Sequence, residues 1–164
     1  MKKVILIAFL SLSIALAIEP KEANVTKFKA NLQLDPVYKL DIKKYPKFAT
    51  KMVLKSGKVI NFISVKSMLN YYYHPEKYPG FGAKSKLDVK EMFVKDYLDG
   101  KELNLKDAWY IFGSKLSGPH GDDLIPVSSK VKAKLFEEKY GGTKIMDFKE
   151  IGNKGFGLIK YLDM

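Results

Sequence analysis

The chain has 164 residues and a formal net charge of +11 at pH 7, and all 29 of its basic residues are lysine. It contains no cysteine, which excludes thiolate catalysis, cysteine-based zinc sites, disulfides and a lipid anchor attached to a cysteine. Arginine is favoured for bidentate contacts to phosphates and bases, so its absence argues against nucleic-acid binding, and the lysines indicate at most electrostatic contact with acidic partners or anionic membrane surfaces.

The amino end has the pattern of a secretory signal peptide. Two lysines precede an apolar run over residues 4–15, and Ala15-Leu16-Ala17 is a small-x-small cleavage signal. The run is shorter than the roughly 20 residues that a transmembrane helix needs, and an uncleaved amino-terminal anchor is the alternative. We therefore expect residues 1–17 to be a cleaved signal peptide, residues 18–36 to be a flexible leader, and the mature protein to be periplasmic.

The first half of the folded chain contains three strand patterns and one helix pattern. Residues 48–55 and 58–63, joined by a Ser-Gly turn, predict a β-hairpin, and residues 91–97 predict a third strand. Between them, Ser64 is a favourable N-cap for a helix that ends at His74. The apolar face of this helix consists of residues at helical spacing: Val65, Met68, Leu69 and Tyr72.

The second half has the same order of elements. Residues 108–116 and 124–127 predict two strands, and Ser128 or Ser129 caps a helix that a Gly-Gly pair ends. Residues 143–151 are expected to supply the last strand. Each half is therefore a ββαβ unit.

We predict an α+β fold in which two ββαβ units, residues 37–100 and residues 101–164, pack as a tandem pseudo-repeat. The two helix entries are similar, FISVK at residues 62–66 and PVSSK at residues 126–130. This similarity favours an internal repeat over a chance likeness of two α+β units.

The sequence shows no constellation of catalytic residues. Its glycine clusters lack the strand, loop and helix context of a phosphate-binding loop, and no serine lies in a nucleophile elbow. Asp122 and Asp123 alone provide too few oxygen ligands for calcium. We therefore do not expect an enzyme.

One turn is the best candidate for a metal site. Gly118-Pro119-His120-Gly121 presents an imidazole away from any apolar face, and neutral imidazole is the commonest metal-binding side chain; the alternative is a turn that happens to carry a histidine. The other histidine, His74, lies beside a proline at a helix end. Thioether and imidazole ligands suit Cu(I), but the methionines of the folded part also occupy positions typical of core residues: Met52, Met68, Met92 and Met146.

Several ordered motifs carry a family resemblance: residues 45–49, 62–68, 93–97, 108–114, 118–126 and 140–142. They resemble the NosL family of nitrous oxide reductase accessory proteins over about residues 37–151. The resemblance implies a periplasmic Cu(I)-binding accessory protein, built from two ββαβ units, that delivers copper toward the copper–sulfur centre of nitrous oxide reductase.

The chain departs from the family at its sulfur ligands. Members carry a lipid-bearing cysteine, a further cysteine and a Gly-Met pair near the start of the domain, where this chain has Tyr38-Lys39-Leu40. They also have methionine in a Gly-Pro-Met-Gly turn, at the position of His120. The resemblance thus leaves His120 as a metal ligand, together with Met68, which matches a methionine of the family's helix. Loss of the thiolate weakens Cu(I) binding or shifts preference toward Cu(II).

Two functions follow from these patterns. In the first, the chain binds copper through His120 and methionine and delivers it to a copper enzyme such as nitrous oxide reductase, or to another periplasmic accessory protein. In the second, it is a metal-free periplasmic binding or scaffolding module that has kept the fold.

Overall fold

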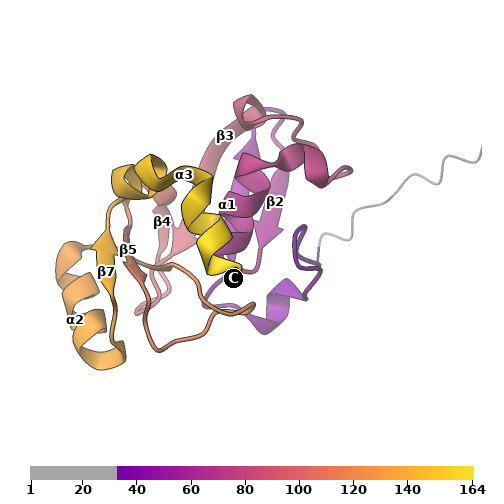
Figure 1. The fold of residues 1–164 in the computed structure, drawn as a ribbon. Coiled ribbons are helices and arrows are strands. Elements are labelled where there is room, and N and C mark those ends of the chain that lie inside the picture. Colours follow the sequence, from indigo (N-terminus) through magenta and orange to yellow (C-terminus); the bar gives the residue numbers. More distant parts are fainter. Residues whose placement is uncertain (1–32) are drawn as a thin grey trace, which may run out of the picture.

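The computed structural model describes residues 33–164, in which two antiparallel sheets and three α-helices pack together (Figure 1). The strands are β1 (Thr50–Leu54), β2 (Val59–Phe62), β3 (Val89–Lys95), β4 (Glu102–Asn104), β5 (Trp109–Phe112), β6 (Ile125–Val127) and β7 (Lys144–Met146). The helices are α1 (Val65–Tyr73), α2 (Lys130–Tyr140) and α3 (Phe148–Leu162). None of these helices has the length and apolar character needed to cross a bilayer. The expected signal peptide and residues 18–32 lie outside the described residues.

The first sheet has the strand order β2-β1-β3-β4. Alternate residues of β1 are buried, so one face of the sheet forms the core and packs under α1. The Ser64 side chain accepts a hydrogen bond from the Ser67 backbone N–H, which confirms the predicted N-cap of α1. The helix ends at His74, as predicted.

The first sheet extends beyond the expected end of the first unit. Gly100 has φ of +76°, a left-handed conformation that glycine adopts without strain, and its N–H bonds back to the Asp96 carbonyl at 2.8 Å. The chain therefore reverses at residue 100, and β4 pairs antiparallel with β3. The expected boundary at residue 100 is a hairpin turn inside the first sheet.

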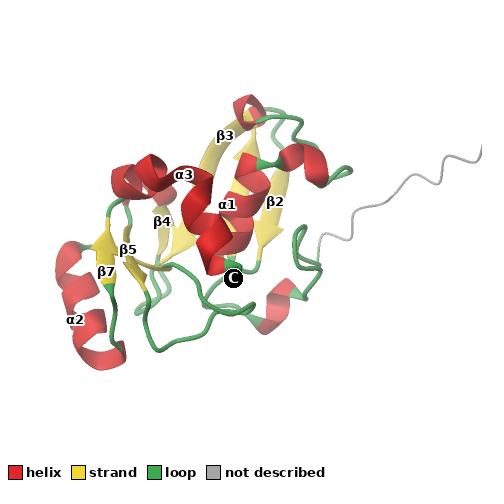
Figure 2. Ribbon diagram, viewed as in Figure 1, coloured by secondary structure: helices red, strands yellow, loops and turns green. Residues whose placement is uncertain are grey.

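The second sheet has the order β6-β5-β7, which reproduces the order β2-β1-β3 of the first. The Ser129 side chain caps α2 by accepting from the Lys132 N–H, and Gly141, at φ of +73°, ends the helix. α2 packs on the outer side of this sheet, where Ala133 and Phe136 are buried (Figure 2). The predicted α+β fold with two ββαβ units is confirmed.

The expected last strand over residues 143–151 is wrong beyond Met146. Asp147 accepts from the Glu150 N–H while the Glu150 side chain accepts from the Asp147 N–H, and this capping box begins α3 at Phe148. α3 kinks at Gly155, and its carboxyl half lies against α1 (Figure 2). Its apolar side joins the main core through four residues: Ile151, Leu158, Ile159 and Leu162. Tertiary burial outweighs the low helix propensity of its three glycines.

The last residues of the expected leader belong to the domain. Asp35 is fully buried, and its carboxylate accepts from the Ser67 hydroxyl at 2.6 Å and the Ile63 N–H at 3.0 Å. It also accepts from the N–H groups of Val37 and Tyr38. Order therefore begins before Val37, because Asp35 joins the chain's entry to the start of α1.

Candidate metal-binding site

The His120 turn depends on glycine at both ends. The Gly118 N–H donates to the Gly121 carbonyl at 2.7 Å, and Gly121 has φ of +77°. A side chain at position 118 would meet the Asp123 Cβ at 2.8 Å. These two glycines close a tight loop with Pro119 and His120 at its tip, as the sequence predicts.

The imidazole of His120 is exposed to solvent on one side and covered by an aromatic ring on the other. It stacks on Tyr38, with ring centroids 4.0 Å apart and an interplanar angle of 15°. The Tyr38 hydroxyl donates to Asp163 Oδ1 at 2.6 Å. Burial, and then this hydrogen bond, raise the pKa of Tyr38 well above its usual value, so the phenol stays protonated. The structure thus brings Tyr38 and its segment directly against the turn.

A buried ammonium group lies beneath the turn. The Lys66 side chain is 1% exposed and lies 3.4 Å from Asp163 Oδ1. Its Nζ donates to the carbonyl oxygens of His120, at 2.5 Å, and Leu162, at 3.1 Å. These three oxygens match the three N–H donors of an ammonium, which is why a lysine is tolerated here. Lys66 thereby links α1, the His120 turn and the end of α3.

Asp123 fixes the other end of the turn to α1. Its Oδ1 accepts from the backbone N–H groups of Lys66 and Leu124, both at 2.9 Å. Oδ2 has no hydrogen-bond partner among the described residues and is buried. Burial raises the pKa of Asp123 to about 6, against the opposing effect of its hydrogen bonds. The negative charge at the amino end of α1 is favourable for the helix dipole but lacks full solvation.

A hollow of about 360 Å³ opens beside His120 and Lys66. Besides these two, it is lined by Gly121, Asp122, Tyr161, Leu162, Asp163 and Met164. Met164 is almost wholly exposed and lines the same hollow as His120, so the hollow is lined by one residue with an imidazole and one with a thioether. No local pattern in the sequence points to Met164, because only the fold of α3 brings residue 164 near residue 120.

The other candidate ligands do not line this hollow. Met68 is fully buried in the main core, and Met52, Met92 and Met146 are buried there too, as their strand and helix positions predict. His74 pairs with Glu76 at 3.2 Å on the surface and contacts the Phe156 ring edge-on. The structure therefore places one of the two predicted ligands, His120, in an accessible site and the other, Met68, in the core.

The donor set around His120 is small. Within residues 33–164, no group of three or more His, Asp or Glu side chains is arranged to hold a metal ion. His120 and Met164 supply one borderline and one soft donor, a pair suited to Cu(I) rather than to hard cations. The carboxylates of Asp122 and Asp163 also line the hollow, although Asp163 is engaged by Tyr38 and Lys66.

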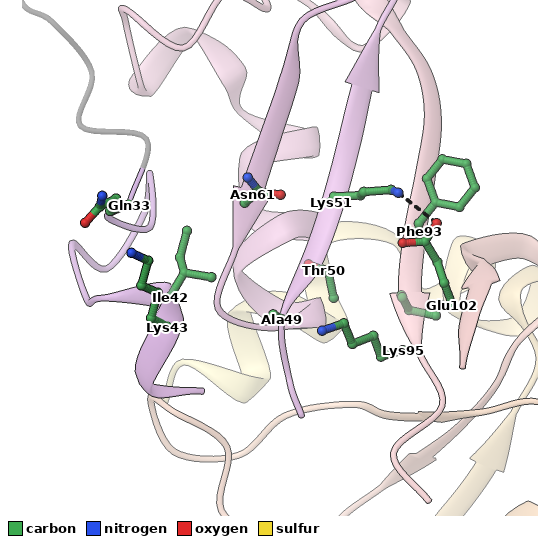
Figure 3. A pocket seen from close by; sticks show the side chains of 11 residues that line it. Gln33, Ile42, Lys43, Ala49, Thr50, Lys51, Asn61, Phe93, Lys95 and Glu102 are labelled. Carbon is green, nitrogen blue, oxygen red and sulfur yellow. Dashed lines mark hydrogen bonds and ion pairs between the residues drawn. The ribbon is translucent and has the colours of Figure 1, made fainter. Parts of the chain in front are cut away.

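A second hollow, of about 330 Å³, lies on the face of the first sheet that points away from the core (Figure 3). It is rich in lysine: Lys51 Nζ lies 4.8 Å from the centroid of the Phe93 ring, and Lys43 and Lys95 line other parts of the hollow. Lys51 Nζ forms an ion pair with Glu102 at 2.7 Å. An ammonium has no lone pair to offer a metal, and neither histidine nor methionine is among the residues from 33 to 164 that line this hollow. The His120 hollow is therefore the better candidate for a metal site.

Comparisons with known proteins identify the family of this chain. The family model NosL matches residues 31–155. A crystal structure of the copper chaperone NosL from Shewanella denitrificans is similar to this chain, with 29% sequence identity and a TM-score of 0.52; the match covers 62% of this chain and 76% of that chain. A search of curated proteins gives no match. The family model spans most of the chain, including both sheets and the His120 turn, and the chain therefore belongs to the NosL family.

Proposed function

We propose that this protein is a periplasmic copper-binding accessory protein that holds Cu(I) at His120 and passes it to a copper enzyme. Membership in the NosL family and similarity to a copper chaperone support a carrier rather than an enzyme. The expected signal peptide supports the periplasm. The observation that carries the proposal is the exposed imidazole of His120 in one hollow with the thioether of Met164.

The surroundings of His120 favour a weak, readily exchanged metal. The Lys66 ammonium donates to the His120 carbonyl, so a positive charge lies close to any bound cation. Like charges at short range lower affinity. The ring of Tyr38 covers one face of the imidazole and restricts its rotation. A metal would bind at a ring nitrogen in the plane of the imidazole, which this stacking does not cover. Nitrous oxide reductase is the client that the family suggests.

Competition for Cu(I) with a chromophoric chelator tests the site. We expect His120→Ala and Met164→Leu each to weaken Cu(I) binding by at least about tenfold, the loss of about 1.4 kcal/mol or more of ligand energy. His74→Ala is the matched control, because it removes the other histidine, which lies outside the hollow. Met68→Leu keeps the volume of a core residue and tests the ligand that the resemblance suggests. Binding that is unchanged in His120→Ala would contradict the proposal.

The alternative, a metal-free binding or scaffolding module, also has a structural basis. Lys66 already places a cation below the turn with all three donors used. Pull-down from periplasmic extract with and without a copper chelator separates the two functions. A partner retained equally in both conditions, together with absent Cu(I) binding, favours the module; a partner retained only with copper favours the carrier.

A further inference from the structure

A third hollow, of about 450 Å³, lies between the second sheet and the carboxyl half of α3. Phe112 on β5 and Met146 on β7 line it from the sheet, while Leu158 and Tyr161 line it from α3. The rings of Phe112 and Tyr161 lie 5.8 Å apart with an interplanar angle of 48°. Most of its lining is therefore apolar and aromatic, and its volume falls in the range of small-molecule sites.

The kink in α3 produces this hollow. Gly155 has φ of +56° and ψ of −148°, so the helix changes direction between Lys154 and Phe156. The amino half of α3 follows β7, whereas the carboxyl half lies on α1 (Figure 1). The second sheet and the carboxyl half of α3 consequently diverge. The third hollow, called the slot below, forms between them.

Two lysines line the same slot. Lys144 Nζ is 3.4 Å from Glu150 and so is partly neutralised. Lys154 also lines the slot, and its side chain makes no hydrogen bond or ion pair with any residue from 33 to 164. Its ammonium is thus available to an anion from solvent. Within the described part of the chain, no acidic residue lines this slot.

We propose that this slot binds a small amphipathic anion, a ligand with an apolar body and one carboxylate or sulfonate group. The apolar body packs between Phe112, Met146 and Leu158, with Tyr161 on its outer side. The acid group pairs with Lys154. This site is distinct in its residues from the His120 hollow except for Tyr161, and it does not depend on copper.

Gly157 offers a way to fill the slot without removing a core residue. It lines the slot, its φ is not in the left-handed region, and a Cβ built on it meets no atom within 4 Å. Gly152 also has open space around its Cβ and lies on the same helix, but it does not line the slot. Gly157→Leu and Gly152→Leu are therefore a matched pair, and Lys154→Gln and Lys149→Gln form a second pair on the same helix.

The probe is 1-anilinonaphthalene-8-sulfonate, an aromatic sulfonate whose fluorescence rises in apolar sites, with decanoate as a non-fluorescent competitor. We expect saturable binding by the metal-free protein and displacement by decanoate. Gly157→Leu should weaken binding at least about tenfold, and Lys154→Gln about threefold, as for an exposed ion pair. Both control variants and His120→Ala should bind like the parent chain. N-phenyl-1-naphthylamine, which lacks the sulfonate, should not distinguish Lys154→Gln from the parent.

Three results would overturn the inference. They are the absence of saturable binding, binding that is unchanged in Gly157→Leu, and an unchanged sulfonate affinity in Lys154→Gln. Circular dichroism of each variant checks that it is folded, because the same probe binds exposed core residues in partly unfolded proteins. If Gly157→Leu does not fold, the Lys154 pair alone decides the result.

Discussion

Asp123→Asn is the substitution that most directly tests the electrostatics of the candidate metal site. The carboxylate is buried, Oδ1 accepts two backbone hydrogen bonds, and Oδ2 has no partner among the described residues. Burial raises its pKa from 3.8 to about 6. At about 1.4 kcal/mol for each pH unit, the shift corresponds to about 3 kcal/mol of differential stability.

The sign follows from the direction of the shift. The folded state holds the proton more tightly than the unfolded state, so the folded protein binds more protons between about pH 4 and about pH 6. Stability from this residue is fully present below about pH 4 and is lost as the pH rises to about 6. Asparagine keeps the acceptor for Lys66 and Leu124 and removes the charge, but it introduces a buried amide donor that costs about 1–3 kcal/mol. At neutral pH we expect the variant to be between about 0 and 2 kcal/mol more stable.

Urea unfolding at a series of pH values measures both effects. The difference in free energy of unfolding between Asp123→Asn and the parent should change by about 3 kcal/mol in favour of the variant between pH 4 and 7. Because the other carboxyl groups are the same in the variant and the parent, their contribution to the pH dependence of stability cancels in this difference. Asp122→Asn is the control, because the side chain of Asp122 is next in the sequence but is exposed to solvent. A difference that does not vary with pH would refute the assignment of a raised pKa to Asp123.

Three further substitutions test hydrogen bonds and a turn that hold the second unit in place. Burial alone would raise the pKa of Asp96, but hydrogen bonds from Lys132 and Ser128 lower it to about 2. The ionised carboxylate therefore stabilises the fold above about pH 4, and Asp96→Asn should lower the free energy of unfolding by about 2 kcal/mol at neutral pH. Urea unfolding should also show that the variant loses less stability than the parent on acidification toward pH 2. Gly118→Ala should lower the melting temperature and weaken Cu(I) binding, because its Cβ would meet Asp123 at 2.8 Å; unchanged values would show that the turn adapts. Ser129→Ala should cost about 1 kcal/mol through loss of the α2 cap, and faster amide exchange confined to α2 would be its signature.

The proposed site shows how a fold can keep the place of a site while its ligands change. In the position where the family resemblance puts cysteine and methionine, this chain stacks Tyr38 on His120. The phenol and imidazole bring two distant segments into contact, and Lys66 and Asp163 link both to the end of α3. The proposed copper ligands, His120 and Met164, therefore lie beside residues that hydrogen bonds and an ion pair hold together.

Local signals in the sequence were sufficient for most of the fold. Strand patterns located β1, β2, β3, β5 and β6 to within a few residues. β3 was located by alternation, whereas β5 was located by its aromatic and β-branched residues. Ser64 and Ser129 located the starts of α1 and α2, because a capping hydroxyl acts within three residues of its own position. The glycine-flanked turn likewise identified His120 as an accessible side chain.

Only the tertiary structure decided the features that depend on distant contacts. α3 contains three glycines and is helical because its apolar residues are buried against α1 and the core, a gain that no local pattern shows. Lys66 has the sequence context of a surface lysine, yet it is buried because oxygens 54 and 96 residues away satisfy its ammonium. The sequence by itself determined the two units and the exposed imidazole; the packing of α3 decided which groups surround that imidazole, because it is the element that carries Met164 and Asp163 to it.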